Sequence, residues 1–141
     1  GKDGFEIRLA GINQAPLPTP GENQEAYTDG KETGIRATVK DGEIVTFGEI
    51  TYVKPGIYRY VIYEKTPEES EQIPGVNYSD ALYVVTVTVT DDGKGALAAN
   101  VKMIQWENDA GQTTSGKTGS DHKYIFCGDR KDQFVRRQIL Y

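Results

Sequence analysis

Two stretches of the chain alternate between apolar and polar residues with the period of two that a β-strand imposes. In residues 56–64, GIYRYVIYE, one side of such a strand carries Tyr58, Tyr60, Ile62 and Glu64. In residues 83–90, YVVTVTVT, three valines share one side and three threonines share the other. Both stretches are therefore predicted to be half-buried antiparallel strands, with the tyrosines and valines inside and the threonines outside.

Turn signals divide the remaining sequence into segments of strand length. The two-residue turn Asp41-Gly42, the turn Lys54-Pro55-Gly56 and the glycine-containing turn 91–95 separate predicted strands. Loops are predicted at residues 15–31, 65–77 and 107–122. Strands are predicted at residues 5–9, 35–40, 43–47, 49–53, 57–64, 82–90, 96–106 and 124–127. Seven or eight short strands at intervals of about ten residues predict an all-β fold, an immunoglobulin-like antiparallel β-sandwich.

The length of 141 residues suits a single domain. We expect the β-sandwich domain to span residues 1–127, because the character of the sequence changes after Cys127. Residues 128–141 hold four basic and two acidic residues without clean alternation. This C-terminal tail is open to three interpretations: a displaced tail, an altered terminus, or a strand borrowed by a neighbouring chain.

Charge and hydropathy exclude several classes of partner. Twenty-one acidic and sixteen basic residues give a net charge of −5, so no basic field is available for nucleic acid. No apolar run approaches the roughly 20 residues that cross a bilayer, so this chain is not expected to insert into a membrane. The start of the chain has no hydrophobic signal core, which indicates either a cytosolic protein or an excised piece.

Motifs for metal, nucleotide or nucleophilic chemistry are incomplete. His122 and Cys127 are the only histidine and the only cysteine in the sequence. The chain therefore has too few of these residues for an internal disulfide or a zinc cluster, and we do not expect a catalytic Cys/His pair. Residues 111–118, GQTTSGKT, match the phosphate-loop pattern, but no helix pattern follows them. Residues 91–93 match half of a calcium loop and are interpreted as a hairpin turn. We therefore expect no cofactor and no metal.

A longer pattern runs through the two alternating stretches and their surroundings. A glycine, Y-x-Y and a glutamate are followed by G-V-x-Y with an aspartate, and then by Y-x-V-x-V-x-V-x-D-x-G-x-G-x-L. This order and spacing resemble the pilin isopeptide-linkage domain of Gram-positive surface proteins over roughly residues 5–103. The pattern is carried by Gly56, Tyr58, Tyr60, Glu64, Gly75, Val76, Tyr78, Asp80, Tyr83, Val85, Val87, Val89, Asp91, Gly93, Gly95 and Leu97.

The resemblance implies a role for Glu64 in a self-catalysed amide bond between a lysine and an asparagine side chain. In that family the glutamate polarises the carboxamide and moves protons while an uncharged, buried lysine attacks. Independently of the resemblance, a carboxylate on an apolar strand face is expected to have a raised pKa. The chain departs from the family pattern at both reacting residues. The family's lysine lies upstream of the residue that matches Phe5, and Lys2 is too near Phe5 to be that lysine. Gly128 stands where the pattern has the asparagine. We therefore expect no cross-link in this chain.

The resemblance further implies a structural domain of a pilus backbone or adhesin stalk, and not an enzyme. Its partners would be other pilin or surface-protein subunits, with a host receptor bound through distal parts, and its location the cell surface, secreted and wall-anchored. The alternative is a ligand-binding adhesin module that recognises glycan or host protein through the loops at residues 15–31 and 107–122. A nucleotidase would require a helix after Thr118.

Overall fold

The computed structural model describes residues 4–40, 45–72, 81–107, 124–125 and 135–139, with the backbone alone at 69, 107, 124–125 and 135–139. The strands are β1 (Phe5–Gly11), β2 (Gln24–Asp29), β3 (Glu32–Val39), β4 (Ile50–Tyr52), β5 (Gly56–Lys65), β6 (Leu82–Asp91), β7 (Leu97–Glu107), β8 (Tyr124–Ile125) and β9 (Val135–Ile139). One turn of 3₁₀-helix, η1 (Glu69–Glu71), follows β5. No helix in the described part of the chain is long and apolar enough to cross a membrane.

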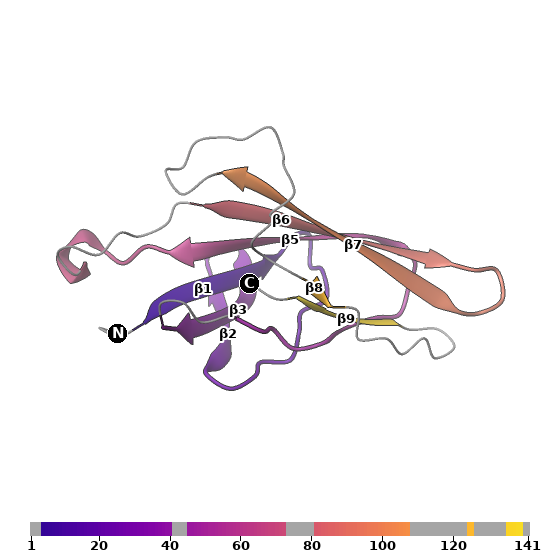
Figure 1. Ribbon diagram of the computed structural model, residues 1–141, viewed down its shortest axis with the longest axis horizontal. Coiled ribbons are helices and arrows are strands. Elements are labelled where there is room, and N and C mark those ends of the chain that lie inside the picture. Colours follow the sequence, from indigo (N-terminus) through magenta and orange to yellow (C-terminus); the bar gives the residue numbers. More distant parts are fainter. Residues whose placement is uncertain (1–3, 41–44, 73–80, 108–123, 126–134, 140–141) are drawn as a thin grey trace.

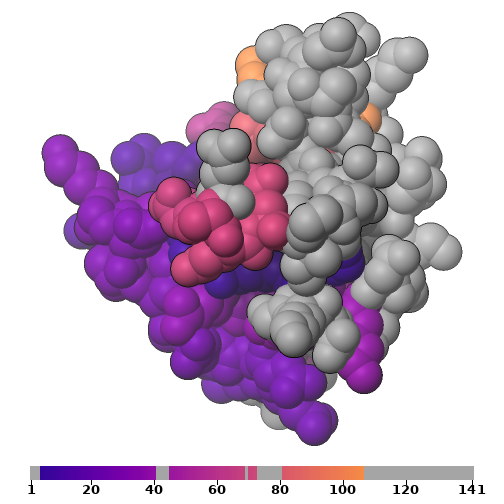
Figure 2. All heavy atoms as spheres, turned by 90° about the vertical axis from the view of Figure 1, so that its left-hand side faces the viewer, coloured from indigo at the N-terminus to yellow at the C-terminus, as the bar shows by residue number. Residues whose placement is uncertain are grey.

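The strands form two antiparallel sheets. The larger has the order β2-β3-β1-β5-β6-β7, and the smaller has the order β4-β9-β8. In Figure 1 the long strands β5, β6 and β7 run side by side, with η1 at one end and the β6–β7 turn at the other. Figure 2 looks at the η1 end, where the segment that follows β5 stands in front of the indigo spheres of the N-terminal part.

The predicted inward and outward sides of β5 and β6 are confirmed. Tyr60 and Ile62 are fully buried, as are Val85 and Val87, and Val89 is nearly so. The alternate threonines of β6 are intermediate or exposed. Register explains the agreement, because Tyr60 lies opposite Val85 and Tyr58 opposite Val87, so the apolar sides of both strands face the same core.

The second sheet packs on that core through β4. Ile50 and Tyr52 have no exposed surface, and they join one buried cluster with residues of the large sheet. The Tyr52 ring lies 4.9 Å from the ring of Tyr58, centroid to centroid. The predicted all-β, antiparallel sandwich is therefore confirmed.

Two element predictions were wrong. Residues 15–31 were predicted to be a loop, but β2 lies within them and pairs with β3 through a tight turn in which Gly30 has a φ of 62°. Its sequence, QEAYTD, shows almost no apolar alternation because only Tyr27 of this edge strand is buried. A strand was also predicted at residues 43–47, yet the described residues 45–47 form only an isolated bridge. The predicted turn Asp41-Gly42 lies outside the described residues.

The C-terminal tail contributes a strand to the smaller sheet. β9 pairs antiparallel with β4, where Ile50 lies opposite Arg137, and with β8, where Tyr124 lies opposite Ile139. The tail thus provides a partner for the short strand β4 within the same chain. Without β9, the backbone groups of β4 on that side would form an open sheet edge.

Candidate functional site

Glu64 lies on the inner side of the large sheet, one residue before β5 ends. Its register partner on β1 is Ile7, and it shares its side of β5 with the fully buried Tyr60 and Ile62. The residue is partly buried, and its Oε1 atom is shielded from solvent. The structure therefore places the sequence-predicted acid next to the core, on the side that the alternation predicts.

The pKa of Glu64 is expected to lie above the value of about 4.3 found in model peptides. Burial of Oε1 removes hydration from the charged carboxylate and favours the neutral acid. NMR titration of the side-chain carboxyl carbon would measure it, and Glu64→Gln would assign the resonance. A measured pKa at or below the model-peptide value would refute this prediction.

The described lysine and asparagine side chains lie at the surface and not in the core. The lysines whose side chains the structure describes are all exposed: residues 31, 40, 54, 65, 94 and 102. The described asparagines, Asn13, Asn23 and Asn100, are exposed as well. Lys2 and Gly128, at which the sequence departs from the family pattern, lie outside the described residues.

A chain of buried hydroxyl groups lies deeper on the same side of the sheet. The Tyr60 hydroxyl donates a hydrogen bond to the Pro16 carbonyl oxygen at 2.6 Å, and the Tyr52 hydroxyl lies 2.9 Å from that of Tyr60. Both tyrosines are fully buried. These bonds join β4, β5 and the β1–β2 loop, so they fix the loop on the core. Sequence reasoning placed Tyr60 inside but had no means of finding Pro16 as its partner.

The opposite, outward side of the large sheet carries a polar cluster around Arg8, which sequence reasoning missed. Arg8 is only 7% exposed. Its Nε donates to Glu6 at 2.6 Å and its Nη1 to Asp29 at 3.0 Å, and the guanidinium lies 4.4 Å from the centre of the Tyr27 ring. Glu32 Oε2 accepts hydrogen bonds from the hydroxyls of Tyr27 and Tyr63 at 2.6 and 2.5 Å. We call this group the Arg8 cluster.

The pKa is raised for Tyr60 in the buried hydroxyl chain and for Arg8, Tyr27 and Tyr63 in the Arg8 cluster. Burial raises the pKa of Tyr60, Tyr27 and Tyr63, and the hydrogen bonds of Tyr27 and Tyr63 to Glu32 raise it further. Burial alone would lower the pKa of Arg8, but hydrogen bonds to Tyr63, Glu6 and Asp29 outweigh it and raise that pKa overall. Arg8 therefore stays charged at every pH at which the protein is folded.

Stability is expected to fall steeply in alkali because the folded pKa of these three tyrosines lies above the unfolded value of about 10. The folded state then binds more protons than the unfolded state, so stability is full below that pH and is lost above it. The loss is up to about 1.4 kcal/mol per pH unit for each tyrosine. Urea unfolding at rising pH, with phenolate absorbance as a second signal, would measure it. Titration of all tyrosines near the unfolded pKa without unfolding would contradict the prediction.

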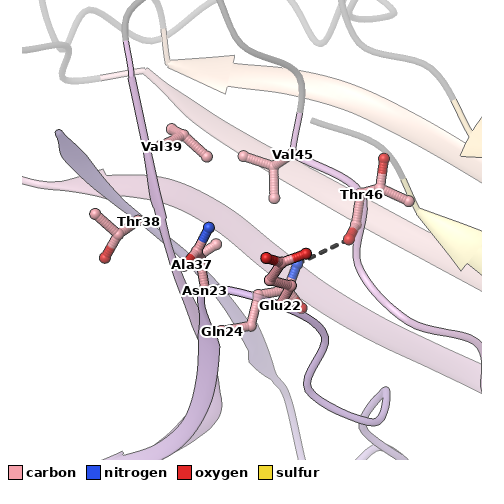
Figure 3. A pocket seen from close by; sticks show the side chains of 8 residues that line it. All are labelled: Glu22, Asn23, Gln24, Ala37, Thr38, Val39, Val45 and Thr46. Atoms are coloured by element: carbon pink, nitrogen blue, oxygen red, sulfur yellow. Dashed lines mark hydrogen bonds between the residues drawn. The ribbon is translucent and has the colours of Figure 1, made fainter.

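A small pocket opens where the start of β2 meets the end of β3 (Figure 3). It has a volume of about 240 Å³. The Gln24 side chain spans it, donating to the Thr46 carbonyl oxygen at 2.8 Å and accepting from the Gly21 amide at 3.1 Å. Its lining residues are Glu22, Asn23, Gln24, Ala37, Thr38, Val39, Val45 and Thr46. Gln24 therefore ties the backbone at Gly21 to the backbone at Thr46 across the pocket.

The acidic turn after β6 is a hairpin turn, as predicted. Asp91 Oδ1 accepts a hydrogen bond from the Gly93 amide at 2.8 Å, and Asp92 Oδ1 accepts from the amides of Lys94 and Ala96. Gly93 and Gly95 have φ values of 79° and 87°, which glycine adopts without strain. The carboxylates therefore hold the turn. Among the described residues no group of three His, Cys, Asp or Glu side chains is arranged so that it could hold a metal ion. The phosphate-loop pattern at residues 111–118 lies outside the described residues.

Comparison with known proteins identifies a family. The model of the family described as the Spy0128-like isopeptide containing domain (FctA) matches residues 2–118. No curated protein and no solved structure matches the chain significantly. The matched segment includes β1 to β7, Glu64, the buried hydroxyl chain of Tyr52 and Tyr60, and the Arg8 cluster.

Proposed function

Because the chain belongs to the Spy0128-like isopeptide containing domain family, we propose that it is a structural domain of a bacterial surface protein, of the pilus-backbone or adhesin-stalk type. In the full-length protein it is exposed at the cell surface and anchored to the wall of a Gram-positive cell. Its partners are other subunits of the same surface assembly, and host contacts are made by distal parts. The match over residues 2–118 carries this proposal.

The arrangement of the strands supports a mechanical role. β1 lies between β3 and β5, and β5 and β6 pair over eight consecutive residues. Pulling such strands apart lengthwise requires many backbone hydrogen bonds to break together. The buried hydroxyl chain and the Arg8 cluster add side-chain bonds that involve five of the strands, β1 to β5.

We propose that this chain forms no Lys-Asn amide bond, because its sequence departs from the family pattern at Lys2 and Gly128. Packing and hydrogen bonds would then stabilise the fold. Amide formation requires amine, carboxamide and acid within contact distance. Of these, the described residues place only Glu64 beside the core, while the lysines and asparagines with described side chains are exposed.

The rival function is a ligand-binding module built on the loops. The described part of residues 15–31 contributes Glu22, Asn23 and Gln24 to the pocket of about 240 Å³, which is smaller than the roughly 300–1,000 Å³ usual for small-molecule sites. Residues 108–122 lie outside the described part.

Single-molecule pulling tests the structural function. The chain would be placed between two reference domains, held by its ends, and stretched. We expect one cooperative unfolding event, followed by an extension that corresponds to the extended length of the whole polypeptide, at about 3.3–3.6 Å per residue. A variant with Thr88→Ala, on the outward side of β6, is the matched control and should unfold at the same force. Extension without a force peak would contradict a mechanical role.

A further inference from the structure

The outward side of the large sheet has an uneven distribution of charge. We call it the outer face; it is opposite the core, on which β4 packs. Strands β2, β3 and β1 form one half of it and strands β5, β6 and β7 the other. The register places the carboxylates of Glu6, Glu25, Asp29 and Glu32 on this side in the first half, and the cations Arg59 and Lys102 in the second.

The first half of the outer face is acidic. Its four carboxylates exceed its two guanidinium groups, Arg8 and Arg36, which are already held by ion pairs. Asp29 keeps 60% of its side chain exposed despite its contact with Arg8. A further positive charge brought to β2 would therefore meet exposed negative charge.

The second half is basic and apolar. Arg59 and Lys102 are exposed, and neither forms an ion pair with a described residue. No carboxylate points outward from β5, β6 or β7 among the side chains that the structure describes there. The two cations flank Thr86 in one row across the sheet.

An apolar row lies beside these cations. Val61 pairs with Val84, and Val84 with Ile104, all on the outward side. On the other half the row meets Ala10, which is only 2% exposed, and Gly34, which is buried. Three large apolar side chains elsewhere on or beside this sheet are exposed to solvent: Ile12 (38%), Ile57 (58%) and Trp106 (49%). Apolar surface between charged margins is typical of a protein interface.

We propose that the outer face binds the outer face of a second copy of this chain, about a two-fold axis parallel to the strands between β1 and β5. Only this axis brings the acidic half of one copy onto the basic half of the other. A two-fold axis across the strands would stack the acidic halves on each other. The inference goes beyond the structural function, because it assigns this face to lateral association.

The register then predicts which rows meet. Asp29 of one copy lies near Lys102 of the second, because the two residues lie in the same row on the two outermost strands. Two sheets that stack face to face usually lie about 10 Å apart. With six strands about 4.8 Å apart, each face is roughly 24 Å wide, which suits a weak, reversible dimer.

Sedimentation equilibrium of the whole chain over a range of concentrations tests the dimer. We expect a dimer that weakens between about 0.01 M and 1 M salt, since the contacts are exposed charge pairs.

Lys102→Asp should raise the dissociation constant of the dimer about tenfold, because the two-fold axis repeats each repulsion. Adding Asp29→Lys should restore the dimer. The matched control is Lys94→Asp, the same charge change in the β6–β7 turn, which should leave the dimer unchanged. Urea unfolding of each variant confirms that it is folded.

Cross-linking tests the axis directly. Asp29 and Lys102 lie on the two outermost strands of one sheet, roughly 24 Å apart, beyond the reach of a zero-length carbodiimide cross-link within one copy. In a mixture of ¹⁴N- and ¹⁵N-labelled chains, mass spectrometry should find these residues joined between differently labelled copies. A chain that stays monomeric at every concentration, a dimer indifferent to Lys102→Asp, or a failure of Asp29→Lys to restore association would each overturn the proposal.

Discussion

Replacing Tyr60 with alanine is expected to lower the free energy of unfolding by about 3–5 kcal/mol, the range for removing a buried aromatic side chain. Tyr60 is fully buried, and its hydroxyl bonds to Pro16 on the β1–β2 loop and to Tyr52 on β4. The substitution therefore removes packing from the centre of the core and leaves the Pro16 carbonyl oxygen without this donor. Urea unfolding followed by fluorescence would measure the change.

The matched variant Tyr60→Phe separates these two contributions. It keeps the ring and removes only the hydroxyl, so we expect a loss of about 1–2 kcal/mol. It should also raise hydrogen exchange in the β1–β2 loop, which the hydroxyl holds on the core. Equal destabilisation by Tyr60→Phe and Tyr60→Ala would mean that the packed ring contributes little, contrary to this prediction.

Replacing Arg8 with methionine is expected to lower the free energy of unfolding by about 2–4 kcal/mol near neutral pH, somewhat less than the loss of one partner from a fully buried ion pair. Methionine fills most of the space of the aliphatic stem but leaves Glu6, Asp29 and Glu32 without the cation between them. The three carboxylates retain some solvent contact, which reduces the loss. The same urea measurement applies.

The chain offers an internal control for this prediction. Arg36 lies directly opposite Arg8 in the register of β1 and β3, and it forms an ion pair with Glu25. Because both of these side chains are well exposed, Arg36→Met should cost less than about 1 kcal/mol. Equal losses from Arg8→Met and Arg36→Met would show that burial does not strengthen the Arg8 cluster.

The alternation of residues was sufficient to predict β5 and β6, because each strand has one buried and one outward side. The same alternation placed Glu64 correctly beside the core. It failed for β2, an edge strand that buries only Tyr27, since a strand held mainly by backbone pairing with β3 requires no apolar pattern.

The Arg8 cluster was beyond sequence reasoning for a different reason. Its members come from β1, β2, β3 and β5, and only the pairing of these strands brings them together. Alternation does place Glu6 and Arg8 on one side of β1, but it treats that side as solvent-exposed. The domain boundary after residue 127 stays a prediction, although β9 of the tail pairs with β4.

Intact mass at unit accuracy is the sharpest test of whether this member of an isopeptide-containing family is held together by packing and hydrogen bonds, without a Lys-Asn bond. We expect the mass of the unmodified sequence, with no ammonia lost. A mass lower by one ammonia, together with a digest peptide that joins a lysine to an asparagine, would contradict this expectation.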